Sequence, residues 1–323
     1  MMKAIVQRRY GPPDVLELEE IDRPVPKDGE VLVRVRAAAV NAADLFLMRG
    51  LPYLIRASGY ARIGPAGRVR GRDLAGQVEA VGGSVTRFRP GDEVYAEAEG
   101  AFAEYVCVPE ASLALKPANL TFEQAAAMPL SAGTALQGLR DRGRIRPGQQ
   151  VLINGASGGV GTFAVQIAKS FGAEVTGVCS ARNADLVRSI GADHVVDYTR
   201  EDFTRSGRRY DLVLDLVANH PLSGFRRVLT PKGTLVLSSG NGSRWFGPMG
   251  RILRALAMSP FTARKLRPLV AKPNGENLVF LKELAESGEV TPVVDRTYPL
   301  SRTPEAVRYL EQEHARAKVV ITV

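Results

Sequence analysis

The amino-acid sequence predicts an α/β protein in which a doubly wound parallel sheet is joined to a β-rich, barrel-like part. Two observations lead to this fold class. Short strand-like stretches broken by Gly and Pro fill the chain up to about residue 118, and strands alternate with helices after about residue 120. At 323 residues the chain is long enough for two domains of ordinary size. We therefore expect a first domain formed by residues 1–124 and 277–323, and a second formed by residues 125–276.

The β-rich part begins with the first residues and returns at the end of the chain. Its strand candidates are the stretches KAIVQ, VLELEEI, EVLVRVRAAAV, LAGQVEAVG, DEVYAE and FAEYVCV. Turn signals at residues 26–29 (PKDG) and 90–92 (PGD) each precede a strand, and a helix from Ala42 to Arg49 is expected after Asn41. The last stretch, KVVITV, is expected to rejoin this domain as a strand.

The part after Leu120 has the rhythm of parallel βαβ units. Thr121 and Gln124 form a capping-box pattern at the start of a helix. The strand candidates that follow are QQVLIN, AEVTGVC, HVVDY, DLVLDLV and GTLVLSS. Residues 241–274 break this alternation and carry several arginines. We expect a lid or a subunit contact there, and the alternative is an open basic approach for a bulky substrate.

Cysteine and histidine usage argues against disulfide and zinc scaffolds. Cys107 and Cys179 lie far apart in strand-like stretches, so we expect buried small side chains rather than a disulfide framework. The 3 histidines stand apart without a second ligand at metal spacing. We therefore expect no zinc site built from His and Cys.

Charge and hydropathy limit the cellular locations and the partners that we expect for the protein. The first residues lack the layout of a secretory signal, and no stretch has the composition of a membrane span, so we expect a cytoplasmic protein. The net charge of +9 is spread mostly over single arginines. This distribution indicates a solvated surface and no nucleic-acid partner.

The strongest functional signal is the stretch VLINGASGGVG at residues 151–161. An apolar strand leads into it and an amphipathic helix leads out, with Gly172 as the expected C-terminal cap. A tight strand-to-helix turn of small residues lets a pyrophosphate approach backbone amides at the positive end of the helix. The expected contacts are Gly155, Ala156, Ser157, Gly158, Gly159, Val160 and Gly161. The alternative is a structural turn without a ligand.

The end of the next strand indicates which nucleotide binds. A site specific for NAD places an Asp or Glu there, on the ribose hydroxyls. This chain instead has Ser180 and Arg182, and no acidic residue occurs between Val175 and Ala184. Because a hydroxyl and a guanidinium suit a 2′-phosphate, the sequence favours NADPH as the cofactor.

Taken together, these motifs resemble the medium-chain dehydrogenase/reductase superfamily, in its zinc-free quinone oxidoreductase branch, over essentially the whole chain. The matching pieces are the opening MKAIV, AVN at 39–41 with Asp44, VGGSVTRFRPGDEV at 81–94, AGT at 132–134, NGASGGVG at 154–161 and HARAKVV at 314–320. The resemblance implies a GroES-like catalytic domain, a Rossmann dinucleotide-binding domain and a homodimer.

The resemblance also implies positions for site residues. It places Asn41 near the nicotinamide and the substrate. The residues that it places around the cofactor are Thr134, Tyr198, Gly240, Asn241 and Arg316, with Lys318 as an alternative to Arg316. Tyr198 is expected beside the 2′-phosphate, although a core aromatic is the alternative. A surface charge is the alternative for Arg316.

Zinc-dependent alcohol dehydrogenases of this superfamily carry a Cys and a His in segments that correspond here to residues 41–44 (NAAD) and 71–73 (GRD). Both ligands are absent from this sequence. The resemblance therefore implies hydride transfer, without a Lewis acid, to a quinone or to the conjugated carbon of an α,β-unsaturated carbonyl compound.

A catalytic hydrogen-bond donor is less well defined. Several quinone reductases carry a tyrosine where this chain has Phe46, and Tyr53 is the candidate to replace it beside the substrate carbonyl. Packing explains Tyr53 equally well.

Two other functions remain open from the sequence. One is an enoyl reductase for thioester or polyketide-type intermediates, which shares the hydride step. The other is a non-catalytic NADPH-binding protein that senses redox state or binds RNA.

Overall fold

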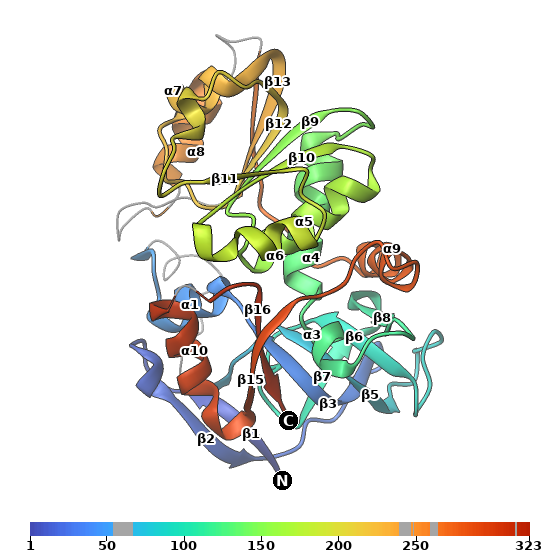
Figure 1. The fold of residues 1–323 in the computed structure, drawn as a ribbon. Helices are drawn as coiled ribbons and strands as arrows, with labels where there is room; N and C mark the ends of the chain where they lie inside the picture. The colour runs from blue at the N-terminus through green and yellow to red at the C-terminus, as the bar shows by residue number, and fades with distance from the viewer. Residues whose placement is uncertain (54–66, 239–246, 248, 259–263, 314) are drawn as a thin grey trace. The chain divides into compact units, whose positions relative to one another are not determined.

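The computed structural model describes residues 1–53, 67–238, 247, 249–258, 264–313 and 315–323, which form two compact units (Figure 1). The first unit comprises Met1–Gly133 and Pro273–Val323, and the second comprises Thr134–Lys272. One boundary falls inside helix α4 (Pro129–Leu136). The sequence placed the boundaries at residues 124/125 and 276/277 instead. The start of α4 belongs to the first unit, where the Leu130 amide donates a hydrogen bond to the carboxylate of Asp73 in the β-rich sheet.

The first unit is built on two sheets. The larger has the strand order β15-β16-β3-β5-β6-β8, with β7 also paired to β3, and the smaller has the order β2-β1-β4. The bounds are β1 Met2–Gln7, β2 Leu16–Ile21, β3 Glu30–Val40, β4 Arg68–Val69, β5 Asp73–Val81, β6 Glu93–Glu97, β7 Tyr105–Pro109, β8 Leu113–Leu115, β15 Val294–Pro299 and β16 Lys318–Thr322.

Strand β3 organises the larger sheet because it is 11 residues long. One edge pairs with β5, while the other pairs with β7 at its start and with β16 at its end. The pairing of β16 with β3 confirms that the last strand rejoins the first domain. It also brings Lys318 to the end of β3, next to Val40 and Asn41.

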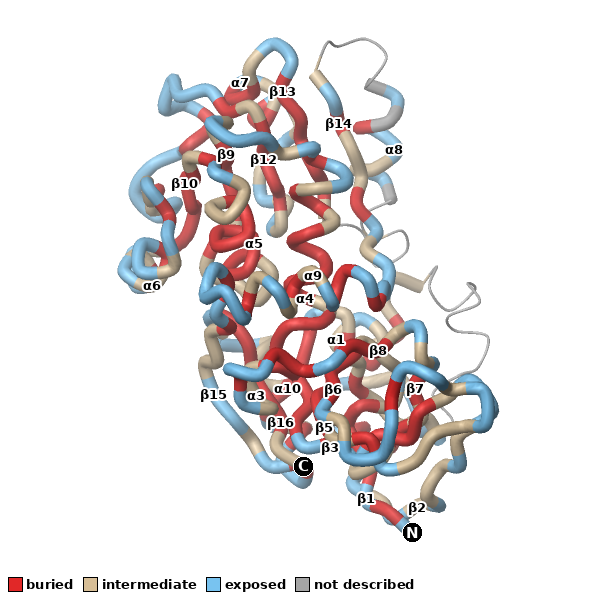
Figure 2. The backbone as a smooth tube through the Cα atoms, turned by 90° about the vertical axis from the view of Figure 1, so that its right-hand side faces the viewer, coloured by how far each residue is buried: buried red, intermediate tan, exposed pale blue. Residues whose placement is uncertain are grey.

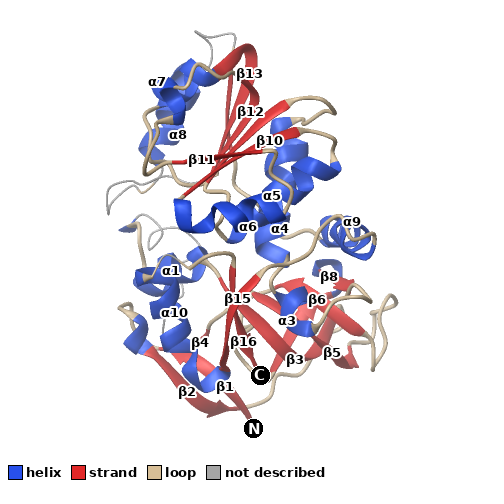
Figure 3. Cartoon of the chain, in the orientation of Figure 1, coloured by secondary structure: helices blue, strands red, loops and turns tan. Residues whose placement is uncertain are grey.

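Two helices of the first unit begin where the sequence signals them, after Asn41 and after Thr121, and Figure 3 shows the helices of this unit in blue. These helices are α1 (Ala42–Arg49), α3 (Phe122–Ala126), α9 (Gly275–Glu286) and α10 (Thr303–Gln312). The predicted capping box is present, since Thr121 Oγ1 accepts from the amide of Gln124, whose side chain accepts from the amide of Thr121.

The second unit is a parallel sheet of six strands in the order β11-β10-β9-β12-β13-β14. Its strands are β9 Gln150–Asn154, β10 Glu174–Cys179, β11 His194–Asp197, β12 Tyr210–Asp215, β13 Leu229–Leu237 and β14 Lys265–Pro268. Numbered from β9, the order is 3-2-1-4-5-6, the Rossmann topology. Helices α5 (Gly159–Ser170) and α6 (Ala184–Ser189) connect the first three strands, while α7 (Leu222–Val228) and α8 (Met249–Met258) connect the last three. In Figure 1, α5 lies on one side of the sheet and α7 and α8 on the other.

Burial explains why these strands are continuous apolar runs. Both faces of the sheet are covered by helices, and β9, β10 and α5 are mostly buried (Figure 2). The core includes Leu152, Val178, Val213, Phe225 and Leu235. The predicted fold class, a Rossmann sheet with a GroES-like β-rich domain, is confirmed.

The sequence missed the four strands β4, β8, β14 and β15. Three of them have only 2, 3 and 4 residues, too few to show an alternating pattern. The fourth, β15, is poorly buried and therefore lacks a clear apolar face. Strand β14 and helix α8 lie in the stretch that was expected to break the βα rhythm. No helix in the described part of the chain is long and apolar enough to cross a membrane.

Candidate active site and nucleotide-binding loop

The predicted glycine loop forms the turn between β9 and α5. Gly155 follows the last residue of β9 with a φ of +91°, and Gly158 is the N-cap of α5. A Cβ atom at Gly161 would lie 2.0 Å from the carbonyl oxygen of Gly155 and 2.8 Å from backbone atoms of Ala156. Only glycine fits this contact between the helix and the loop.

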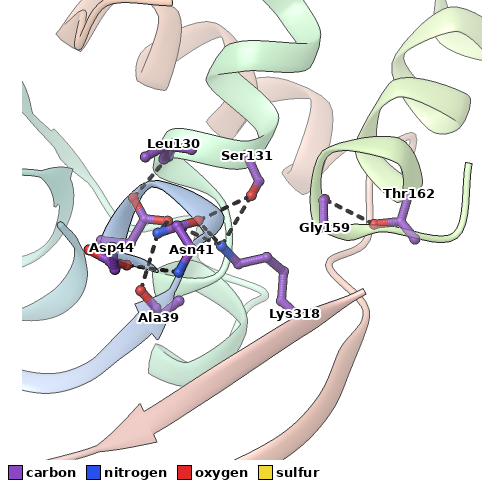
Figure 4. A network of polar contacts seen from close by, with 9 residues as sticks. Ala39, Asn41, Asp44, Leu130, Ser131, Gly159, Thr162 and Lys318 are labelled. Atoms are coloured by element: carbon purple, nitrogen blue, oxygen red, sulfur yellow. Dashed lines mark hydrogen bonds and ion pairs between the residues drawn. The ribbon is translucent and has the colours of Figure 1, made fainter. Parts of the chain in front are cut away.

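The loop uses some of its amides internally. The amides of Gly155 and Ala156 both donate to the carbonyl of Val178 on β10, and that of Gly158 donates to Gly155. The Thr162 hydroxyl donates to the Gly159 carbonyl at 3.3 Å (Figure 4). The amides that helix geometry leaves without an intrahelical acceptor are those of the first turn, from Gly159 to Gly161. A narrow glycine cradle at a helix N-terminus suits a pyrophosphate, so the residues present fit a dinucleotide cofactor.

A buried polar cluster supports the base of the loop. Asn154 Nδ2 donates to Asp215 Oδ1 at 2.7 Å, at the point where β9 and β12 diverge. Asp215 is fully buried, and its Oδ2 lies 2.6 Å from Arg251 Nη2 on α8. The amide of Ala218, which has a φ of +64°, donates to the same carboxylate at 3.0 Å. These contacts fix helix α8 and the loop after β12 to the carboxyl edge of the sheet.

The end of β10 carries the predicted nucleotide-specificity residues. Arg182 is exposed, and Asn183 is buried with its Nδ2 donating to Ser157 Oγ at 3.1 Å. Tyr198 follows the neighbouring strand β11, and its side chain is 54% exposed. The alternative that Tyr198 is a core aromatic is therefore wrong. Asn183, which was not among the predicted contacts, links the glycine loop to the specificity segment.

A second polar cluster lies in the first unit, around Asn41 (Figure 4). Asn41 precedes α1, and its Nδ2 donates to Asp73 Oδ2 at 3.0 Å and to the Ala39 carbonyl at 3.2 Å. Lys318 Nζ donates to Asn41 Oδ1 at 2.5 Å and to Ser131 Oγ at 3.1 Å, and it lies 3.3 Å from Asp73 Oδ2. These side chains come from the residue between β3 and α1, from β5, from α4 and from β16.

Burial governs the ionisation of the carboxyl groups in this cluster. Burial raises the pKa of Asp44 to about 7, although a hydrogen bond from the Asn41 amide opposes the shift. Burial also raises the pKa of Asp73, and the charge of Lys318 acts in the opposite direction. In the same region, burial raises the pKa of Glu97, which is paired with Arg72 at 2.7 Å. The site therefore places an ammonium group and a guanidinium group beside buried carboxyl groups whose pKa is raised.

Asp44 should make the stability of the protein depend on pH. Its folded pKa of about 7 exceeds the unfolded value of about 4, so the folded state binds the extra proton between these values. The free energy of unfolding should fall as pH rises through this window, by about 2.6 kcal/mol between pH 5 and pH 8. Asp44→Asn keeps an acceptor for the Asn41 amide and should remove this part of the dependence. Urea unfolding of both proteins at pH 5, 6, 7 and 8 measures the difference, and parallel pH curves would contradict it.

The remaining predicted residues are spread over the described chain. Thr134 is buried on α4 and Tyr53 is half-buried after α1, where Phe46 is 52% exposed. Arg316 lies 3.6 Å from Asp295, with its side chain 55% exposed. The predicted cofactor contacts Gly240 and Asn241 lie outside the described residues.

Sequence reasoning missed the assembly of Asp73, Ser131 and Lys318. In the sequence, Asp73 stands out only as part of the segment 71–73, which lacks the zinc ligand of the alcohol dehydrogenases. Ser131 is not among the predicted site residues, and Lys318 is predicted only as an alternative cofactor contact. A charged residue at the start of an otherwise apolar last strand, KVVITV, was the available signal. Two buried charges must be paired, and the partner could not be chosen without the fold.

Comparison with known proteins identifies the family. A family model described as the alcohol dehydrogenase GroES-like domain matches residues 27–118, and one described as zinc-binding dehydrogenase matches residues 190–321. The NADPH-dependent alkenal/one oxidoreductase of Arabidopsis thaliana, a chloroplastic protein, is 37% identical over 99% of this chain and 79% of its own length. A chloroplast envelope quinone oxidoreductase homolog from the same plant is 31% identical over 99% of this chain and 98% of its own length. The quinone oxidoreductase of Coxiella burnetii superposes with a TM-score of 0.88 at 29% identity, covering 100% of this chain and 99% of its own.

The protein is thus an oxidoreductase with a GroES-like domain and a nicotinamide-nucleotide domain. The chain belongs to the medium-chain dehydrogenase/reductase superfamily, in its zinc-independent quinone oxidoreductase branch.

The described residues do not fit the zinc ion that one family description mentions. Asn41 and Asp73, in the segments that correspond to the zinc ligands of alcohol dehydrogenases, both contact the Lys318 ammonium group. A second cation beside this ammonium would be strongly repelled in a buried site. Within the described residues, no group of three or more His, Cys, Asp or Glu side chains is placed to hold a metal ion.

Proposed function

We propose that the protein transfers hydride from NADPH to a quinone or to the conjugated double bond of an α,β-unsaturated carbonyl compound, without a metal. The observation that carries this proposal is the glycine loop followed by β10, after which Ser180 and Arg182 occur and no acidic residue lies between Val175 and Ala184. The names of the alkenal/one oxidoreductase and of the two quinone oxidoreductase relatives support the substrate class.

The bound cofactor supplies the hydride, and the protein binds and orients the cofactor. The first-turn amides of α5, together with the glycine loop, hold the pyrophosphate. Arg182 and Ser180 bind the 2′-phosphate, with Tyr198 beside it. The other proposed cofactor contacts are Thr134, Gly240, Asn241 and Arg316. The substrate needs little activation because its reacting carbon is already electrophilic, so positioning is the main contribution of the protein.

Arg182→Ala should weaken the binding of NADPH but not that of NADH. Loss of a charge-assisted hydrogen bond to the 2′-phosphate costs about 1.5–3 kcal/mol, so the KM for NADPH should rise about 10-fold to 100-fold. The KM for NADH should stay within about twofold, because NADH lacks that phosphate. Arg188→Ala is the matched control, since Arg188 is exposed on α6 and paired with Asp185. An unchanged KM for NADPH in Arg182→Ala would remove the basis for NADPH preference.

Tyr53 is proposed to donate a hydrogen bond to the substrate carbonyl as negative charge develops there. Tyr53→Phe should lower kcat for an alkenal about 10-fold or more, while the KM for NADPH stays the same. Stopped-flow mixing with NADPH, followed at the nicotinamide absorbance, measures this step for a quinone, an alkenal and an enoyl thioester. Parent rates for both the quinone and the alkenal would show that the phenol has no such role. A preference for the thioester would favour an enoyl reductase.

The assembly and location remain part of the proposal. We propose a homodimer, which sedimentation equilibrium tests directly, and a cytoplasmic location without a nucleic-acid partner. Because the chain is an oxidoreductase by family, a purely non-catalytic role is set aside.

A further inference from the structure

We propose that Lys318 is a positioning residue of the active site, whose buried ammonium group orients the Asn41 amide. The inference rests on the proposed function in one respect, namely that Asn41 lies in the substrate site. Its structural part concerns the first unit alone.

The ammonium group has a complete set of oxygen partners. Lys318 is 2% exposed, and its Nζ lies 2.5 Å from Asn41 Oδ1, 3.1 Å from Ser131 Oγ and 3.3 Å from Asp73 Oδ2. An ammonium group has three N–H donors, so each can point at one of these oxygens. Asn41 and Ser131 are also almost fully buried, and Asp73 is fully buried. No N–H of Lys318 is left for a substrate, and the residue must act through its neighbours.

The backbone immediately before Lys318 has a left-handed conformation. Ala317 is buried and has a φ of +60°, a left-handed conformation that non-glycine residues rarely adopt. It directly precedes the first residue of β16, where Lys318 pairs with β15 at Val294. The fold thus accepts an unfavourable backbone conformation next to the residue that delivers the ammonium group.

Lys318 decides how the Asn41 amide is turned. An ammonium group cannot accept a hydrogen bond, so Asn41 must present Oδ1 to Lys318 and Nδ2 to the other side. The two hydrogens of Nδ2 are then directed to Asp73 Oδ2 and the Ala39 carbonyl. Without Lys318, the amide oxygen would lose its shortest contact, at 2.5 Å, while the Ser131 hydroxyl lies farther away at 3.5 Å. The orientation of Asn41 at the start of α1 therefore depends on Lys318.

Asp73 depends on the same cation. Its carboxylate is fully buried, and it accepts from the Leu130 amide at 2.9 Å and from Asn41 in addition to facing Lys318. The other ionisable groups in this region are Asp44 on α1 and the Arg72–Glu97 pair. Removal of the ammonium group would leave Asp73 buried without its nearest opposite charge, and its pKa should rise further.

The test compares Lys318→Met with Lys318→Met/Asp73→Asn. In Lys318→Met, kcat with NADPH and a quinone should fall at least 10-fold, while the KM for NADPH stays within about twofold because the glycine loop and Arg182 belong to the other unit. The pH profile of kcat/KM should gain an ionisation that the parent profile does not show, because the pKa of Asp73 rises. The double variant should lose that ionisation but not regain kcat, because the Asn41 amide is still not oriented.

Two further measurements separate positioning from a structural role. Ethylamine or propylamine should partly restore kcat of Lys318→Ala in a saturable way, since a small alkylammonium ion replaces the missing group. The pH titration of the Asp73 carboxyl ¹³C shift, which needs no activity, should move to higher pH in Lys318→Met than in the parent, because the counter-charge is lost. Lys282→Met is the control, because Lys282 pairs with Glu286 on α9 and should leave kcat unchanged.

The outcomes are distinguishable. A parent protein without NADPH-dependent reductase activity overturns the proposed function, and the Asp73 shift still decides the cation role. A folded Lys318→Met variant with the parent kcat and pH profile overturns the inference. So does a loss of kcat without a new ionisation and without amine rescue, which would indicate a structural residue only.

Discussion

Replacing Gly161 with valine is expected to weaken productive nucleotide binding strongly. The new Cβ would lie 2.0 Å from the Gly155 carbonyl oxygen and 2.8 Å from the backbone of Ala156, and backbone atoms cannot rotate away as a side chain can. The first turn of α5 must move, and with it the amides that hold the pyrophosphate. A shift of about 1 Å is enough to lower kcat/KM for NADPH about 100-fold, and overpacking should also destabilise the fold by about 1–3 kcal/mol.

Isothermal titration with NADPH and urea unfolding measure the two effects of Gly161→Val separately. Gly250→Ala on α8 is the control, since a Cβ there meets nothing within 4 Å. It should keep the parent affinity and stability. Parent-like NADPH affinity in Gly161→Val would mean that the loop does not bind the cofactor.

Arg251→Met is expected to destabilise the protein by about 3–5 kcal/mol, because it leaves the carboxylate of Asp215 buried without a counter-charge. Asp215 is fully buried, and the Arg251 side chain is only 13% exposed. Removing one partner of such a pair costs more than removing both. The double variant Arg251→Met/Asp215→Asn should therefore recover most of the loss, and its asparagine can still accept from Asn154 Nδ2.

Urea unfolding at pH 7 provides the free energies of the parent and the two variants. A double variant less stable than Arg251→Met would contradict the explanation by an uncompensated charge. Parent-like stability of Arg251→Met would show that α8 does not hold this pair in solution. Because the cluster supports the base of the glycine loop, the affinity for NADPH should fall together with stability in Arg251→Met.

Local signals determined much of the second unit. A buried parallel strand is a continuous apolar run, a glycine loop is a fixed pattern of small residues, and both are contained in about 30 consecutive residues. The predicted strands of this unit were therefore confirmed, and a similar local pattern correctly predicted the helix start at Thr121 in the first unit. A short strand such as β4, with 2 residues, has no local signal in the sequence. It forms because it can pair with the edge of β1.

The sequence by itself determined the fold class, the glycine loop and the absence of a carboxylate at the end of β10, because each depends on residues that are close together in the sequence. Tertiary structure decided which amides of the loop are already used, since Val178 accepts those of Gly155 and Ala156 from a different strand. It also decided the cluster around Lys318, whose partner Asn41 is 277 residues away. A buried ammonium group needs oxygen partners, and the tertiary structure provides them, because β16 pairs with β3 beside Asn41 and β5 pairs with β3 beside Asp73.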